Sequence, residues 1–276
     1  MLRGSDRARR GSLLLPASAG SVWVALASTV VVFAGLALIV VNSSGWPKVK
    51  EAFFNPAEFR AYFGTIGHAF VLNIKIFLVA EVVILILALF LAVLRQLPGP
   101  VFFPIRLLAI GYTDLFRGIP TILLVLLFGF GIPALHLSYV TINPVYLGAA
   151  ALIVIYTAYV SEVYRAGIES VHPSQEAAAR SLGLTRGQAM RAVILPQAVR
   201  RVIPPLLNDF LALTKDVALV SILGPQEAFR IAQIDASSTF NYTPLVAAAL
   251  LYLCITIPLA RVTDRVTRRT REARGL

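Results

Sequence analysis

The chain is poor in cysteine and in charge, and each shortage excludes a class of protein. Its one cysteine, Cys254, has no second cysteine to pair with, so the fold is not a disulfide scaffold. Charged residues are only 14% of the 276 residues, whereas soluble domains contain about 25%. Apolar residues make up 58%, too many for an intrinsically disordered chain, and the mean hydropathy is +0.78. The composition therefore predicts an integral membrane protein.

Apolar runs long enough to cross a bilayer recur along the chain. A membrane helix needs about 20 mostly apolar residues, and six stretches are candidates, although the third and fifth contain or adjoin charges. They are residues 22–41, 66–94, 120–132 (extended back toward 107), 144–163, 202–223 and 243–261. The sequence thus predicts an all-α membrane protein with about six transmembrane helices, whose core is residues 66–262.

Most of the 25 lysines and arginines fall in alternate gaps between these stretches. They gather before the first stretch (residues 1–21), between the second and third, after the fourth, and in the tail (263–276). Because positive charge collects on the cytoplasmic side of membrane proteins, we expect both termini to be cytoplasmic and residues 42–65 to be extracytoplasmic. The arginines therefore serve topology, and no nucleic-acid partner is expected.

The N-terminal third contains two features that need interpretation. Residues 22–41 follow arginines as a signal peptide would, but the run is long and lacks a cleavage pattern of small residues, so we interpret it as a retained membrane helix. Residues 42–65 are rich in aromatic side chains. These suit a short helix along the membrane surface or a docking surface for a soluble partner, and the sequence leaves both open.

The cytoplasmic segment between the fourth and fifth stretches, residues 162–210, has more local pattern than a simple connector needs. The tripeptide 172–174 (His-Pro-Ser) is a helix start signal. Gly183 is placed to end that helix, and Thr185 can cap a second one that Pro196 interrupts. The pattern predicts an exposed helical hairpin suited to docking, with a solvated connector as the alternative.

This segment resembles the EAA loop of bacterial ABC importer permeases, in the branch that serves polar amino acids. The family pattern is Glu-Ala-Ala, three residues, Gly, nine residues, Ile, one residue, Leu-Pro. In this register Gly183, Val193 and Pro196 stand at the Gly, Ile and Pro positions. Ala177 stands where the family has glutamate, and Glu176 lies one residue earlier, so whether Glu176 replaces the family's acid stays open.

Three further stretches resemble the same branch: LFRGIP at 115–120, AYVSEVYRAGIESV at 158–171 and LPQAVRRVIPPLLNDFLALTKDVALVSILG at 195–224. Together the resemblance covers residues 65–252. It implies the membrane-spanning permease subunit of a binding-protein-dependent amino-acid importer in the bacterial cell (inner) membrane, with a fold like that of type I ABC importer permeases. The implied partners are cytoplasmic ABC ATPase subunits, a second permease subunit (the same or a paralogue) and an extracytoplasmic amino-acid-binding protein, beside membrane lipid.

By this resemblance, the hairpin within residues 169–200 inserts into a groove on the ATPase. Small alanines would allow close approach, and arginines would pair with acidic groups of the ATPase. The expected coupling residues are Glu176, Ala177, Ala178, Ala179, Arg180, Leu182, Gly183, Arg186 and Pro196. Replacing Gly183 by aspartate is expected to abolish coupled uptake while the protein stays in the membrane.

No catalytic or cofactor-binding motif is present in the sequence. It contains no P-loop, no zinc-ligand spacing and no G-x-S-x-G, and its three histidines are isolated: His68, His136 and His172. We therefore expect a chain that is not an enzyme and binds no metal or cofactor. ATP and Mg²⁺ would be bound and used by the partner ATPase subunits.

Charges within the predicted spans offer a translocation path, because each costs about 2.5–3.5 kcal/mol near the bilayer centre. Lys75 and Glu81 are six residues apart and do not face each other, whereas Asp209 and Asp216 share one helix face. The charges could bind the ammonium and carboxylate of a zwitterion, or they could form interhelical ion pairs. The residues expected to line the path are Asn73, Lys75, Tyr159, Glu162, Lys215 and Asp216.

An ion-coupled secondary transporter of a small zwitterion is the main alternative function. Six spans and intramembrane charges would suit it, but the two halves show no convincing internal repeat and the docking hairpin would have no purpose. A membrane enzyme would need a convergent catalytic set, and none is visible. The sequence leaves open which amino acid is carried and whether the permease is a homodimer or a heterodimer.

Overall fold

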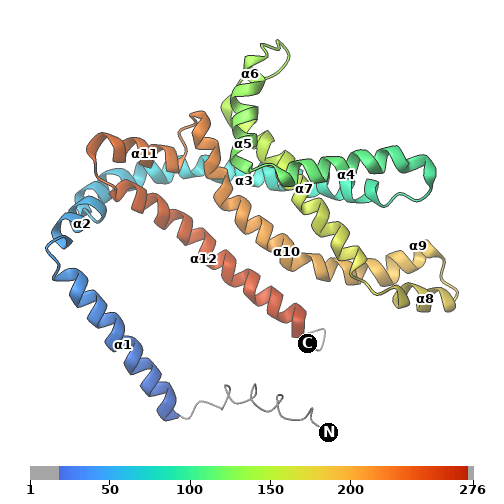
Figure 1. Cartoon of the computed structure of the whole chain (residues 1–276), viewed down its shortest axis with the longest axis horizontal. Coiled ribbons are helices and arrows are strands. Elements are labelled where there is room, and N and C mark those ends of the chain that lie inside the picture. The colour runs from blue at the N-terminus through green and yellow to red at the C-terminus, as the bar shows by residue number, and fades with distance from the viewer. Residues whose placement is uncertain (1–18, 273–276) are drawn as a thin grey trace, which may run out of the picture. The chain divides into compact units, whose positions relative to one another are not determined.

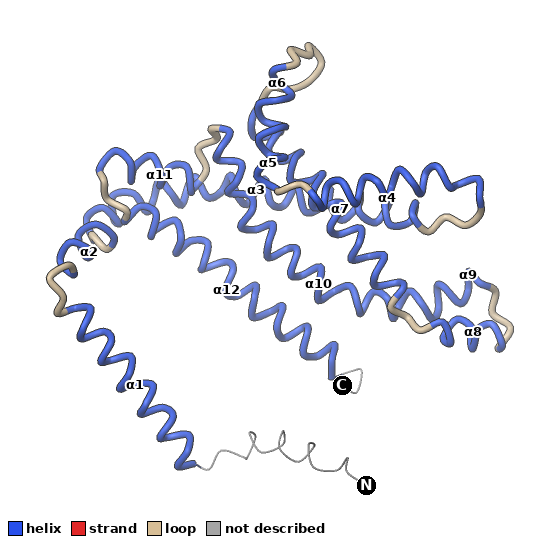
Figure 2. Tube along the Cα trace, viewed as in Figure 1, coloured by secondary structure: helices blue, strands red, loops and turns tan. Residues whose placement is uncertain are grey.

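The computed structural model describes residues 19–272, in which helices joined by short loops are the only regular elements (Figures 1 and 2). The chain divides into two units, residues 1–54 and 55–276, and each is described by itself. Residues 1–18, which hold most of the expected basic N-terminus, and residues 273–276 of the tail lie outside the described part of the chain. The helical architecture confirms the all-α prediction.

The first unit contains α1 (Ala19–Val41) and α2 (Trp46–Phe53). Residues 20–41 of α1 have the length and hydropathy of a membrane span, as predicted for residues 22–41. In α2, Trp46, Val49 and Phe53 share one helix face by their spacing. A short helix therefore forms in the aromatic segment, as one of the two interpretations of that segment requires.

The second unit begins with α3 (Pro56–Arg95), a helix of 40 residues. It starts ten residues before the predicted span, because the side chain of Asn55 accepts hydrogen bonds from the backbone N–H groups of Ala57 and Glu58. Pro56 at the first turn adds a preset backbone angle. The end of the segment predicted as extracytoplasmic, up to residue 65, is thus continuous with the membrane helix.

The third predicted span is wrong as a single helix. The chain there forms α4 (Phe103–Gly118) and α5 (Thr121–Leu126), and the two helical segments are bent by 103° at the break between them. Pro120 causes the break, since it has no N–H to donate and it excludes the residue before it from the helical region. Ile119 accordingly has extended angles, with φ −90° and ψ 131°.

The fourth and sixth predicted spans are α7 (Pro144–Glu169) and α12 (Thr243–Glu272). The side chain of Asn143 caps α7 by accepting a hydrogen bond from the N–H of Val145 at 2.9 Å. Both helices continue past their predicted ends. The predicted boundary between the membrane core and the C-terminal tail, at residue 262, therefore lies inside α12. The first residues of the predicted tail, up to Glu272, belong to this helix.

Between α7 and α12 lie the predicted hairpin and the fifth predicted span. The elements are α8 (Pro173–Ser181), α9 (Arg186–Ala189), the π-helical turn η3 (Met190–Ile194), α10 (Leu195–Asp216), the 3₁₀ turn η4 (Val217–Leu223) and α11 (Ala228–Thr239). Figure 1 shows the α8–α9 hairpin and α11 at opposite ends of α10. The hairpin thus lies at the end of the second unit that is far from α11.

The prediction that Pro196 interrupts the second hairpin helix is wrong, because the helix continues through it from α9 into α10. A proline ring strikes the carbonyl four residues before it in a regular α-helix. The widened π-helical turn η3 directly precedes Pro196 and relieves this clash. The same arrangement occurs before Pro133, which follows the π-helical turn η2 (Leu127–Gly131) and lies in α6 (Ile132–Ala134).

The number of spans is only partly determined by helix length and composition. In the described residues, four helical segments meet the requirements of a span alone, and the bent α4–α5 pair could provide a fifth. The helix at the fifth predicted position, α10, does not meet them, because it contains arginines, aspartates and a lysine. A count of six spans therefore stays a prediction.

The core of the second unit is built around α7, which packs against α3, α4 and α10. Two glycines allow close approach of its neighbours. A Cβ at Gly148 would lie 2.7 Å from Val220 of η4, and one at Gly167 would lie 2.0 Å from Val202 of α10. Since neither position has room for a larger side chain, α7 packs closely against η4 at Gly148 and against α10 at Gly167.

Candidate functional site

The hairpin begins with a cap that fixes the direction of α8. His172 Nδ1 accepts a hydrogen bond from the backbone N–H of Ser174 at 3.2 Å, and Pro173 occupies the first turn. The start signal at residues 172–174 is thereby confirmed, with His172 rather than Ser174 as the capping residue. The helix α8 therefore begins only a few residues after the end of α7.

The turn between α8 and α9 depends on Gly183, whose φ is +85°. The N–H of Gly183 bonds the carbonyl of Arg180 at 3.0 Å, and the N–H of Leu184 bonds that of Ala179 at 3.3 Å. This pair of bonds is the Schellman arrangement, which needs a left-handed residue and favours glycine. Thr185 then caps α9 together with Gln188 in a reciprocal capping box, as its position predicted.

The outer surface of the hairpin differs in part from the expectation. Ala179 is buried at 4% exposure and packs inside the hairpin, so only Ala177 and Ala178 present small side chains outward. Arg186 Nε lies 3.6 Å from Glu176 Oε1, a contact that joins the two helices of the hairpin. Glu176 is therefore positioned by α9, and Arg186 has a partner within the chain.

The most exposed coupling residues lie at the turn. Leu182 is 84% exposed, and Arg180 and Gly183 are exposed beside it. The exposed leucine side chain contributes no hydrophobic stabilisation to the fold, because it is not buried against other residues of the described chain. Pro196 is also exposed, but it lies at the start of α10 and not on the turn.

The hairpin is fastened to α7 and α10 by a small apolar core. Val171, Ile194 and Ala198 are buried together, with Ile168 and Met190 packed against them. Polar contacts add to this core: Arg201 of α10 donates to the carbonyl of Ser170, and Gln197 of α10 donates to Gln175 of α8 at 3.4 Å. A force on the hairpin is thus passed to both α7 and α10.

An ionic network joins the ends of α3, α4 and α7. Arg95 Nη1 lies 2.8 Å from Glu162 Oε2 and 3.4 Å from the hydroxyl of Thr113. Arg165 pairs with both Glu162 and Glu169. The local Glu162–Arg165 pair predicted from their spacing is confirmed. With two arginines on its carboxylate, Glu162 connects α7 to α3.

A second polar cluster lies at the opposite end of the second unit. The amide of Asn73 donates to Glu227 Oε2 at 2.7 Å and to the hydroxyl of Tyr252 at 2.8 Å, and its oxygen accepts from the N–H of Ala228 at 3.2 Å. Glu227 is fully buried and also accepts two backbone N–H groups at the start of α11, at 2.7 and 3.0 Å. Asn73 therefore holds α11 against α3 and α12.

Neither Glu227 nor Tyr252 was a candidate from the sequence. Glutamate is not among the favoured N-cap residues, and Tyr252 lies inside an apolar run where an aromatic side chain carries no polar signal. The only available signal was an acidic residue directly before a helix, which is too common to single out Glu227.

The remaining path residues lie on α3, α7 and α10. The hydroxyl of Tyr156 donates to Asp216 Oδ2 at 2.9 Å, and that of Tyr159 donates to the carbonyl of Arg117 at 3.3 Å. Lys75 and Lys215 are exposed. The six path residues are thus distributed over separate places, with Asn73 and Glu162 in the two clusters described above.

One carboxylate in this region differs from the others. Asp209 Oδ2 is buried and has no hydrogen-bond partner among residues 19–272. Asp209 of α10 and Glu81 of α3 lie within electrostatic range of each other, and Tyr156 of α7 is within range of both aspartates of α10. The shared face predicted for Asp209 and Asp216 is consistent with this placement. Asp235 Oδ2 of α11 is the other buried carboxylate oxygen without a partner in the described residues, so Asp209 is the one that lies on α10, near Glu81 and Tyr156.

Comparison with known proteins decides the family. A family model described as the binding-protein-dependent transport system inner membrane component matches residues 101–272. The matched range includes the hairpin, Glu162 of the ionic network, and Glu227 and Tyr252 of the second polar cluster. The chain belongs to this family. It is an inner-membrane component, and such components are membrane subunits rather than ATPases.

Individual relatives agree with this permease assignment. The arginine transport system permease protein ArtQ of Bacillus subtilis (strain 168) is 33% identical over 199 residues, which are 72% of this chain and 89% of the relative. The probable glutamine ABC transporter permease protein GlnM of the same organism is 38% identical over 161 residues, 58% of this chain and 73% of the relative.

A solved structure supports the fold of the permease. The crystal structure of an amino acid ABC transporter with histidines has a chain 31% identical to this one, with a TM-score of 0.71 over 78% of this chain and 98% of that chain. The type I importer fold expected from the sequence is thereby confirmed.

Proposed function

We propose that this permease is the membrane subunit of an ATP-driven importer for a polar amino acid that an extracytoplasmic binding protein delivers. The observation that carries the proposal is the exposed, rigidly capped hairpin at one end of a bundle whose relatives are amino-acid ABC permeases. A hairpin fastened to α7 and α10 serves a transporter that is driven from outside the chain. An ion-coupled transporter would have no use for it.

In the proposed cycle, the ATPase subunits bind ATP and Mg²⁺ and close on each other while they hold the hairpins. Leu182 at the turn supplies an apolar contact, and Ala177 and Ala178 permit close approach to the ATPase surface. The core around Ile194 then passes the movement to α7 and α10 as rigid bodies. Both chain termini and the hairpin lie on the cytoplasmic side, and a second permease subunit, identical or paralogous, completes the path.

The substrate path is proposed to run beside Asp209. Its unpartnered buried carboxylate is suited to receive the ammonium group of an amino acid, because a cation replaces the hydrogen bonds that the acid lacks. Lys215 lies six residues after Asp209 on α10 and so faces another direction, and it would contact the substrate carboxylate at a separate point of the path. Lys75 of α3 is the second candidate for that role. Asp216 accepts from Tyr156, whose ring lies 6.3 Å from that of Tyr159, so these two residues would extend the path from Asp209. Asn73 and Glu162 would keep the ends of the path in place.

The test of the proposal is uptake into vesicles that contain the permease with or without its ATPase and binding protein. Radiolabelled polar amino acids, presented with ATP on the cytoplasmic side, should accumulate only when all the components are present. Uptake by the permease alone, driven by an ion gradient, would instead establish the secondary transporter.

The variant Asp209→Asn should lose most of its uptake, by tenfold or more, while it folds at least as stably as the wild type. The amide has the same shape but cannot pair with an ammonium, and removing a buried unpaired charge relieves a desolvation cost. Uptake in the reconstituted importer and thermal unfolding in detergent measure the two effects. Asp114→Asn, at an exposed carboxylate of α4, is the matched control and should change neither.

Full uptake by Asp209→Asn would remove this residue from the path. A loss of uptake together with lower stability would assign Asp209 a structural role, because its carboxylate would then be needed for folding.

A further inference from the structure

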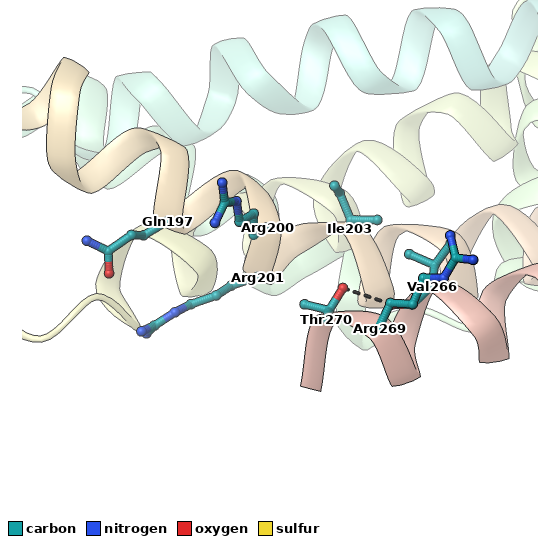
Figure 3. A pocket seen from close by; sticks show the side chains of 7 residues that line it. All are labelled: Gln197, Arg200, Arg201, Ile203, Val266, Arg269 and Thr270. Atoms are coloured by element: carbon teal, nitrogen blue, oxygen red, sulfur yellow. Dashed lines mark hydrogen bonds between the residues drawn. The ribbon is translucent and has the colours of Figure 1, made fainter. Parts of the chain in front are cut away.

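A pocket of about 410 Å³ opens between α10 and α12, next to the hairpin (Figure 3). Three arginines line it: Arg200 and Arg201 from α10 and Arg269 from α12. No acidic residue is part of the described lining. The pocket therefore concentrates positive charge at one end of two helices.

This charge is largely uncompensated within the described chain. Arg201 donates to the carbonyl of Ser170, but Arg200 and Arg269 make no hydrogen bond or ion pair with any residue between 19 and 272. In Figure 3 the three guanidinium groups point in different directions around the rim. The pocket is thus a broad basic rim and not a clamp closed around one small anion.

The walls of the pocket are apolar. Ile203 and Val266 line it between the arginines, and Ile203 is 37% exposed. The helix α12 contains an apolar stretch sufficient for a membrane span, and Arg269 follows that stretch in the charged end of the helix, where the headgroup region of the bilayer is expected. Apolar walls below a basic rim at this depth match a molecule with acyl chains and an anionic headgroup.

We propose that this pocket binds the phosphate headgroup of an anionic phospholipid from the cytoplasmic leaflet. Basic pockets between membrane helices on this side are suited to anionic headgroups, and arginine forms strong bonds to phosphate. Gln197 and Thr270 add polar side chains to the rim. The assignment of the leaflet rests on the proposed orientation of the permease.

A lipid in this pocket would contact the base of the coupling hairpin. Gln197 lines the pocket and donates to Gln175 of α8 at 3.4 Å. Arg201 lines it and holds the carbonyl of Ser170 at the end of α7. The headgroup therefore stabilises the junction through which the hairpin drives the bundle, and coupling should depend on anionic lipid.

The test uses the full-length chain in nanodiscs of phosphatidylcholine, with fluorescent phosphatidylglycerol as the probe. Each arginine near an anionic membrane surface contributes about fivefold to binding, so Arg200→Gln with Arg269→Gln should weaken association of the probe about 30-fold. Arg191→Gln, an exposed cytoplasmic arginine outside the pocket, is the control for charge and should bind within about twofold of the wild type.

Three outcomes would overturn the proposal. Equal probe association in the double variant and the wild type means that the pocket is not a lipid site. Displacement of the probe by millimolar inorganic phosphate means a site for free anions. Unchanged probe association with loss of ATPase co-purification means a docking site for acidic protein surface. Because probe association needs neither ATP nor transport, its result is independent of whether the proposed uptake is observed.

Discussion

Replacing Gly183 by aspartate should abolish coupled uptake and co-purification with the ATPase, while the protein remains folded in the membrane. Apart from its two chain neighbours, no residue of the described part of the chain has an atom within 4 Å of the position of a Cβ at Gly183, so there is room for the side chain. The φ of +85° adds a backbone cost of about 1–2 kcal/mol, which aspartate tolerates better than most residues. The main effect is a charged side chain at the tip of the docking surface.

The matched control is Gly99→Asp. Gly99 also has a positive φ, +92°, with no atom within 4 Å of its Cβ position, and it lies in the loop between α3 and α4. The two variants therefore have the same charge and similar backbone strain. Co-purification and uptake that are equal in both variants would contradict the assignment of the hairpin as the ATPase-docking element.

Replacing Glu162 by glutamine should destabilise the fold by about 3 kcal/mol. The change leaves Arg95 without its one carboxylate partner among residues 19–272, and it takes one of the two such partners from Arg165. Removing one partner of a largely buried ion pair costs about 3–5 kcal/mol, and the partial exposure of this pair, 12% for Arg95 and 21% for Glu162, places the effect at the low end. Thermal unfolding in detergent measures it.

Two variants separate this effect from simple loss of charge. Glu169→Gln removes the more exposed partner of Arg165, 56% exposed, and should cost less than about 1 kcal/mol. Arg95→Gln combined with Glu162→Gln removes both charges and should recover part of the stability. If Glu162→Gln unfolds like the wild type but no longer takes up substrate, Glu162 belongs to the substrate path instead.

The local signals in the hairpin were predictable because they depend on neighbouring residues only. Gly183 ends a helix by its own left-handed backbone, and Thr185 caps the next helix through Gln188, three residues away. The failure at Pro196 has an equally local cause, since a π-helical turn absorbs the proline. Such a turn leaves no mark in the hydrophobic pattern.

The partners of the intramembrane polar residues could not be predicted. Glu162 pairs with Arg95, which is 67 residues away in the sequence. Asn73 donates a hydrogen bond to Glu227, which is 154 residues away. Periodicity shows which face of its own helix a side chain occupies, but it does not show which other helix packs there. The choice between ligand site and interhelical contact therefore depended on tertiary structure.

The sequence by itself determined the membrane class, the positions of most helices, the hairpin and the family resemblance, because composition, hydropathy and capping act over short distances along the chain. Only the tertiary structure decided that Glu162 and Asn73 join helices, that Asp209 lacks a partner, and that Arg200 and Arg269 meet at one pocket. Those facts depend on how α3, α7, α10 and α12 pack against one another, which residues far apart in the sequence decide together.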